Sequence, residues 1–151
     1  MQLLWPECAL AAIAVEGLSP ADQPRASAAT TEIADVVLYY GSTVFEHTKR
    51  TTIAQFKYSI TRSTVAFRAA DAKKTIEKFA QAYQSYRTNH ARDAVKAKLA
   101  FELITNRPVY PPLLEAIEAL ASGSLGKGEV GRQAQQFQAA AGLGGRLLVA
   151  F

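Results

Sequence analysis

Two apolar runs rich in β-branched and aromatic residues, IADVVLYY at 33–40 and TTIAQFKYSI at 51–60, constrain the fold most. This composition is typical of buried β-strands, because branched and aromatic side chains pack well on a pleated surface. The segment between them opens with a glycine and then turns polar. We therefore expect an antiparallel hairpin with a long connection, on which the rest of the chain builds its core.

The pattern becomes helical from residue 70 to 87, where apolar residues fall on one stripe. Before the hairpin, the alanine-rich segment 8–17 ends at a glycine and predicts a buried helix. This order predicts an α/β fold, a mixed central β-sheet flanked by helices on both faces, in a single domain spanning 1–151. The other expected elements are a second short helix or an extension of the 70–87 helix at 90–98, a strand at 99–106, helices at 112–123 and 129–141, and a last strand at 147–151.

The overall composition limits the chemistry. The formal net charge of +4 is compatible with a polyanionic partner. The chain has one cysteine and two histidines, which excludes a disulfide framework and a cysteine-based zinc site and leaves oxygen ligands, preferred by magnesium or manganese. The N-terminus lacks the basic segment of a signal peptide, so we expect a cytoplasmic protein without a membrane partner. The strand-like end, RLLVAF, is also what a fragment of a longer polypeptide would show.

Polar residues inside apolar strands carry the functional signal. Asp35 interrupts the first run, and Gln55 and Lys57 interrupt the second. Residues two apart on a strand point to the same face, so Gln55 and Lys57 are expected to share one. One interpretation is a cross-strand ion pair between Asp35 and Lys57, which offsets the cost of burying both charges. The other is a metal site in which carboxylate and amide oxygens hold a divalent ion, and the lysine either assists an attacking water or stabilises the charge that builds on a phosphate.

The runs EIADVV (32–37) and IAQFKY (53–58) resemble the PD-(D/E)XK, or restriction-endonuclease-like, superfamily. They are most similar to the N-terminal double-stranded-DNA nuclease domains of bacterial anti-phage effectors, many of which carry Q-x-K. The segments 71–79 and 101–108 extend the resemblance. It implies a restriction-endonuclease-like fold and Mg²⁺- or Mn²⁺-dependent endonuclease activity on DNA in antiviral defence. It also implies a homo-oligomer when active and a regulatory or sensor domain in the full-length protein.

The resemblance assigns Asp35 as the metal-binding acid, Gln55 to the second metal-binding position and Lys57 as the catalytic lysine. Such sites often include an acid from the first helix, for which Glu7 and Glu16 are the candidates. Either glutamate is equally compatible with a solvated position on that helix. Because Gln55 is neutral where the superfamily usually has an acid, we expect weaker metal binding.

Basic and polar residues near these motifs are candidates for tracking the phosphates of double-stranded DNA. The alternatives are a solvated helix face for the basic residues and a turn-forming role for the asparagine. A catalytically inactive DNA-binding or oligomerisation module of the same fold is the alternative to an endonuclease. The candidate nucleic-acid contacts are Lys49, Arg50, Arg62, Arg68, Lys73, Lys74, Asn106 and Arg107.

Overall fold

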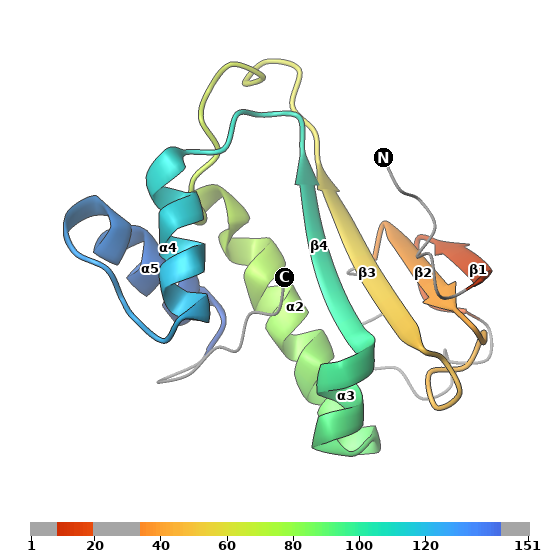
Figure 1. The fold of residues 1–151 in the computed structure, drawn as a ribbon. Helices are drawn as coiled ribbons and strands as arrows, with labels where there is room; N and C mark the ends of the chain where they lie inside the picture. The colour runs from red at the N-terminus through yellow and green to blue at the C-terminus, as the bar shows by residue number, and fades with distance from the viewer. Residues whose placement is uncertain (1–8, 20–33, 143–151) are drawn as a thin grey trace. The chain divides into compact units, whose positions relative to one another are not determined.

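The computed structural model describes residues 9–19 and 34–142 (Figure 1). The chain divides into two compact units, which we call the sheet unit (Met1–Phe56 and Gln81–Ile104) and the helix unit (Lys57–Ala80 and Thr105–Phe151). The elements in chain order are β1 (Leu10–Val15), β2 (Val36–Tyr40), β3 (Arg50–Lys57), α2 (Ala69–Asn89), α3 (Arg92–Lys98), β4 (Leu99–Thr105), α4 (Pro111–Ala121) and α5 (Gly128–Ala140).

The four strands form one sheet in the order β1-β2-β3-β4. Neighbours β1 and β2 are antiparallel, as are β2 and β3, which confirms the predicted hairpin. The chain returns through α2 and α3 to β4, and Figure 1 shows β3 and β4 running in the same direction. The fold is therefore α/β, with a mixed sheet flanked by helices.

The core of the sheet unit lies on the face shared by cross-strand partners of β2 and β3. Val37 pairs with Ile53 and Tyr39 with Thr51, and all four are fully buried. The β2–β3 connection adds Phe45, whose ring contacts the ring of Tyr86 in α2 at a centroid distance of 4.6 Å. This packing fixes the hairpin, and with it the sheet end that carries Asp35 and Gln55.

The helix predicted at 8–17 is wrong, because the structure forms strand β1 there. Alternate residues of Leu10–Val15 are half-buried and exposed, as expected of a strand with one face on the core. Pairing with β2 along most of its length supplies the hydrogen bonds that outweigh the helix propensity of the alanines. The candidate Glu7 and the strand expected at 147–151 lie outside the described residues.

In the helix unit, α4 and α5 pack against each other. Ala116, Leu120 and Ala134 are buried together, with Val130 and Phe137 packed against them. A buried glutamine of α5, Gln133, fastens the start of α2 by accepting the backbone N–H of Ala69 at 3.0 Å. Within the described ranges, no helix has the length and apolar character needed to cross a bilayer.

Candidate active site

Three sequence-predicted residues lie at or next to the ends of neighbouring strands, at one end of the sheet. Glu16 follows β1, Asp35 precedes β2, and Gln55 lies near the end of β3. Backbone hydrogen bonds link them, because the N–H of Glu16 donates to the carbonyl of Asp35 at 3.0 Å and the N–H of Asp35 donates to Ala54 at 3.2 Å. The hairpin therefore places Asp35 beside the segment of β3 that carries Gln55.

The Asp35 carboxylate is held in place by β3. Its Oδ2 accepts the backbone N–H of Phe56 at 2.6 Å, and the residue is half-buried. A charge-assisted hydrogen bond of this length fixes the orientation of a carboxylate more firmly than a neutral one. The acid is thus oriented by the residue directly after Gln55.

Gln55 is buried, with 8 % of its surface exposed. Among the described residues, its Oε1 is one of the buried side-chain oxygens that accept no hydrogen bond. A buried carbonyl oxygen without a donor costs about 1–3 kcal/mol, and native proteins rarely retain one without a reason such as a bound water or ion. A hard divalent cation accepts electron pairs from carbonyl and carboxylate oxygens, so this oxygen fits the predicted metal role.

Glu16 lies directly after strand β1 rather than on the predicted first helix. Its φ angle is +53°, in the left-handed region that non-glycine residues seldom adopt. Such conformations persist where the surroundings impose them and are concentrated at functional sites. Glu16 is solvent-exposed, and the backbone hydrogen bond to Asp35 keeps this acid at the same sheet end.

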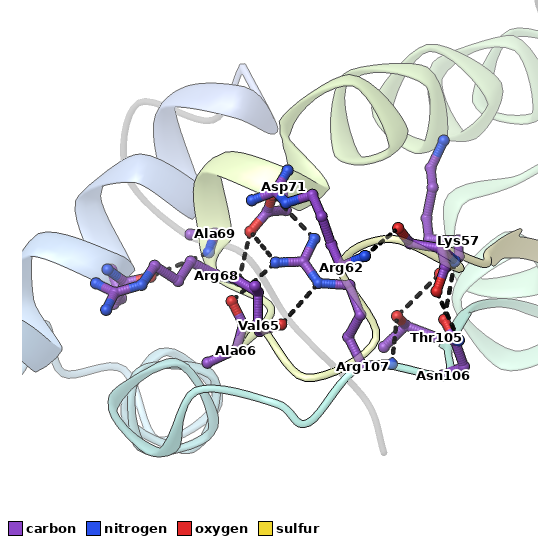
Figure 2. A network of polar contacts seen from close by, with 12 residues as sticks. Lys57, Arg62, Val65, Ala66, Arg68, Ala69, Asp71, Thr105, Asn106 and Arg107 are labelled. Carbon is purple, nitrogen blue, oxygen red and sulfur yellow. Dashed lines mark hydrogen bonds and ion pairs between the residues drawn. The ribbon is translucent and has the colours of Figure 1, made fainter.

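Lys57 is the last residue of β3 and is half-buried. Strand alternation places it on the same face of β3 as Gln55. Its backbone carbonyl accepts a hydrogen bond from Thr105 Oγ1 at 2.9 Å, whereas its side chain points away from Thr105 in Figure 2. No sequence signal had indicated Thr105, since the contact joins the ends of two strands far apart in the chain.

Arg107, predicted to contact DNA, has a buried side chain that is committed to the protein instead. Its Nε donates to the carbonyl of Val65 at 2.8 Å and its Nη2 to that of Ala66 at 2.9 Å (Figure 2). Its Nη1 also pairs with Asp71 Oδ1 at 3.1 Å. A guanidinium used in this way has its donors directed toward the protein, so Arg107 has a structural role, and its contact with DNA stays a prediction.

Asp71 is the anionic partner in this network. Burial raises its pKa, but the hydrogen bond from Arg107, the backbone N–H of Arg68 and the charges of Arg107 and Arg62 outweigh that effect and lower the pKa below its ordinary value of 3.8. The carboxylate is therefore ionised at neutral pH. It ties the first turn of α2 to the loop that follows β3.

The other residues predicted to contact nucleic acid differ in exposure and in the contacts that their side chains make within the protein. Asn106 is exposed, but its amide is hydrogen-bonded to the backbone of Ser59 on both sides. Among the basic candidates, ion pairs join Arg62 to Asp71, Arg68 to Glu129 and Lys73 to Glu77. In the sheet unit, Arg50 is half-buried and donates to Thr52 Oγ1, whereas Lys49 is exposed. Lys74 on α2 is exposed as well.

Within residues 9–19 and 34–142, no three side chains of the His, Cys, Asp and Glu types are close enough to share a metal ion. No family model matches the chain, and no curated protein is significantly similar to it. The resemblance to PD-(D/E)XK nucleases therefore rests on the sequence motifs alone.

Proposed function

We propose that this chain is a metal-dependent DNA endonuclease with a restriction-endonuclease-like fold. Asp35 and the Oε1 atom of Gln55 hold Mg²⁺ or Mn²⁺, and Glu16 is a further oxygen donor at the same sheet end. The observation that carries the proposal is the buried Gln55 Oε1, which accepts no hydrogen bond from the described residues and lies on β3 directly before Phe56, whose N–H orients the Asp35 carboxylate. Oxygen ligands of this kind are the ones that these hard cations prefer.

The reaction adds water across one P–O ester bond of the DNA backbone. When bound, the metal ion polarises the phosphoryl oxygen and lowers the pKa of the attacking water. The Phe56 N–H orients the Asp35 carboxylate, so this ligand approaches the metal ion from a fixed direction. The ammonium group of Lys57 stabilises the negative charge that develops on the phosphate, as a cation placed beforehand can do without reorganisation.

The wider biological role follows from the resemblance. We propose that the domain is the DNA-cutting effector of a cytoplasmic anti-phage system, that it acts on double-stranded DNA as a homo-oligomer, and that a regulatory or sensor domain in the full-length protein activates it. The excess of basic over acidic residues supports a polyanionic substrate.

The test is plasmid nicking with and without Mg²⁺. Asp35→Ala and Lys57→Ala are expected to abolish Mg²⁺-dependent nicking while leaving the circular dichroism spectrum unchanged. A matched control is Lys127→Ala, because Lys127 is an exposed lysine whose side chain, within the described part of the chain, makes no capping bond to α5. This control should nick like the wild type. Full nicking by both site variants would exclude the mechanism.

A second candidate is a catalytically inactive DNA-binding or oligomerisation module of the same fold. The neutral Gln55, in a described region without a three-acid cluster, favours it. Such a module would bind duplex DNA with a steep salt dependence and show no response to Mg²⁺ in binding or unfolding. Mg²⁺-dependent stabilisation that disappears in Asp35→Ala would exclude it.

A further inference from the structure

The segment directly after Lys57 exposes two large apolar side chains. Tyr58 is 73 % exposed and Ile60 is 80 % exposed, and one residue, Ser59, separates them. A single exposed apolar residue is ordinary on a protein surface and needs no explanation. Two that flank one fixed residue form a small apolar tip, which we define as residues 58–60.

The backbone at the centre of this tip is held on both sides by one side chain. Ser59 N–H donates to Asn106 Oδ1 at 3.0 Å, and Asn106 Nδ2 donates to the carbonyl of Ser59 at 3.0 Å. The hydroxyl of Ser59 also accepts the N–H of Arg62 at 3.1 Å. The amide of Asn106 therefore pairs with Ser59 as a neighbouring strand would.

Both ends of the loop that carries the tip are also tied. Thr105 holds the carbonyl of Lys57, and Arg107 holds the carbonyls of Val65 and Ala66 (Figure 2). Three consecutive residues, 105–107, thus fix the loop from outside it. Because the loop is ordered in advance, the apolar tip can bind without paying the entropy of ordering its backbone.

The charge of the loop indicates the kind of partner. Residues 57–68 contain three basic side chains, Lys57, Arg62 and Arg68, and no acidic one. The side chains of Arg62 and Arg68 are 55 % and 51 % exposed, although they also pair with Asp71 and Glu129. A partner that is both negatively charged and rich in flat apolar surfaces is a nucleic acid, whose phosphates attract the cations and whose bases stack on aromatic rings.

We propose that the 58–60 tip is a rigid wedge for nucleic-acid bases, in which Tyr58 stacks on a base and Ile60 fills the gap that unstacking opens. Apolar side chains inserted between base steps have this effect on duplexes. The proposal rests on the proposed function only in taking DNA as the ligand. It assigns the tip to base contact and leaves the chemistry of hydrolysis to other residues.

The test measures binding without cleavage. A short DNA duplex with 2-aminopurine near its centre is titrated with protein in EDTA, and both anisotropy and 2-aminopurine fluorescence are recorded. The double variant Tyr58→Ala/Ile60→Ala is expected to bind at least about 10-fold more weakly and to lose the fluorescence increase, since each stacked base contributes substantially to affinity. The salt dependence should stay unchanged, because no phosphate contact is removed.

Two further variants sharpen the test. Leu125→Ala removes an apolar side chain that is 46 % exposed in the α4–α5 loop, and it should bind like the wild type. Tyr58→Phe keeps the ring and should retain the fluorescence signal. Equal affinity of the double variant and the wild type, or equal losses in the double variant and Leu125→Ala, would overturn the wedge. So would a wild-type protein that does not bind DNA.

The experiments can refute the wedge and the proposed hydrolysis independently of each other. If the wild type binds and unstacks the duplex but never nicks DNA with Mg²⁺, the wedge stands and the proposed endonuclease activity falls. If the wild type nicks DNA while the double variant binds and nicks equally well, the endonuclease stands and the wedge falls.

Discussion

Replacing Gln55 by methionine should stabilise the protein in the absence of metal and remove its response to Mg²⁺. The amide oxygen of Gln55 is buried without a donor among the described residues. Such an orphaned carbonyl costs about 1–3 kcal/mol, and methionine fills a similar volume with no oxygen to satisfy. We therefore expect Gln55→Met to raise the free energy of unfolding in EDTA by about 1–2 kcal/mol.

Mg²⁺ should reverse this order of stability. A ligand that binds only the folded protein stabilises it by about 2.7 kcal/mol at 100 times its dissociation constant. The wild type should gain that stabilisation as Mg²⁺ is raised, and Gln55→Met should gain none. Gln55→Glu should do the opposite of methionine, because a second carboxylate beside Asp35 destabilises the metal-free protein and strengthens metal binding.

The assay is urea unfolding followed by far-UV circular dichroism, with EDTA or a series of Mg²⁺ concentrations. Thr51→Val is a matched control, because Thr51 Oγ1 is also buried without a hydrogen-bond partner in the described part of β3. It should be at least as stable as the wild type in EDTA and keep the full Mg²⁺ response. A Gln55→Met protein less stable than the wild type in EDTA, or equally stabilised by Mg²⁺, would refute the reasoning.

Three other predictions concern the helix unit. Arg107→Met should lower the free energy of unfolding by about 2–3 kcal/mol, measured in urea, because the partly buried Asp71 carboxylate loses its charged hydrogen-bond partner and keeps only Arg62 and the Arg68 N–H; a loss under about 1 kcal/mol would contradict the role of the network. Because Asp71 has a lowered pKa, its contribution should be complete above pH 3.8 and disappear as the pH falls through its lower folded value, so acid unfolding of Arg107→Met should lose this component. Gly126→Ala should destabilise more than Gly128→Ala in thermal unfolding: both have positive φ, but only at Gly126 would a Cβ lie 2.6 Å from Val130 Cγ1. Equal shifts would contradict that crowding.

Strand periodicity was enough to predict the hairpin and the place of Asp35 beside the segment that carries Gln55. Those features depend on local alternation and on pairing between neighbours in the sequence. Strand β1 was missed because its alanines favour a helix in isolation, and its strand form depends on pairing with β2. Local propensity carries no information about such a partner.

The role of Arg107 could not be predicted for a similar reason. Its burial depends on carbonyls of Val65 and Ala66, which lie about 40 residues earlier in the chain. From the sequence alone, an arginine after a strand is equally compatible with an exposed cation and with a buried side chain that binds backbone carbonyls. Gln55 shows the converse, since its residue type was noticed in the sequence, whereas the burial of its oxygen without a donor among the described residues depends on tertiary packing.

The loop after β3 is restrained by hydrogen bonds from Thr105, Asn106 and Arg107, and this restraint determines where the sequence of the protein can vary. The restraints come from outside the loop and bind mostly its backbone, so they do not depend on which side chains the middle of the loop carries. Substitutions and small insertions between residues 61 and 64, which are all exposed, should leave the fold intact. The segment is thus a natural site for diversification, where a library of loop sequences can be selected on one unchanged scaffold.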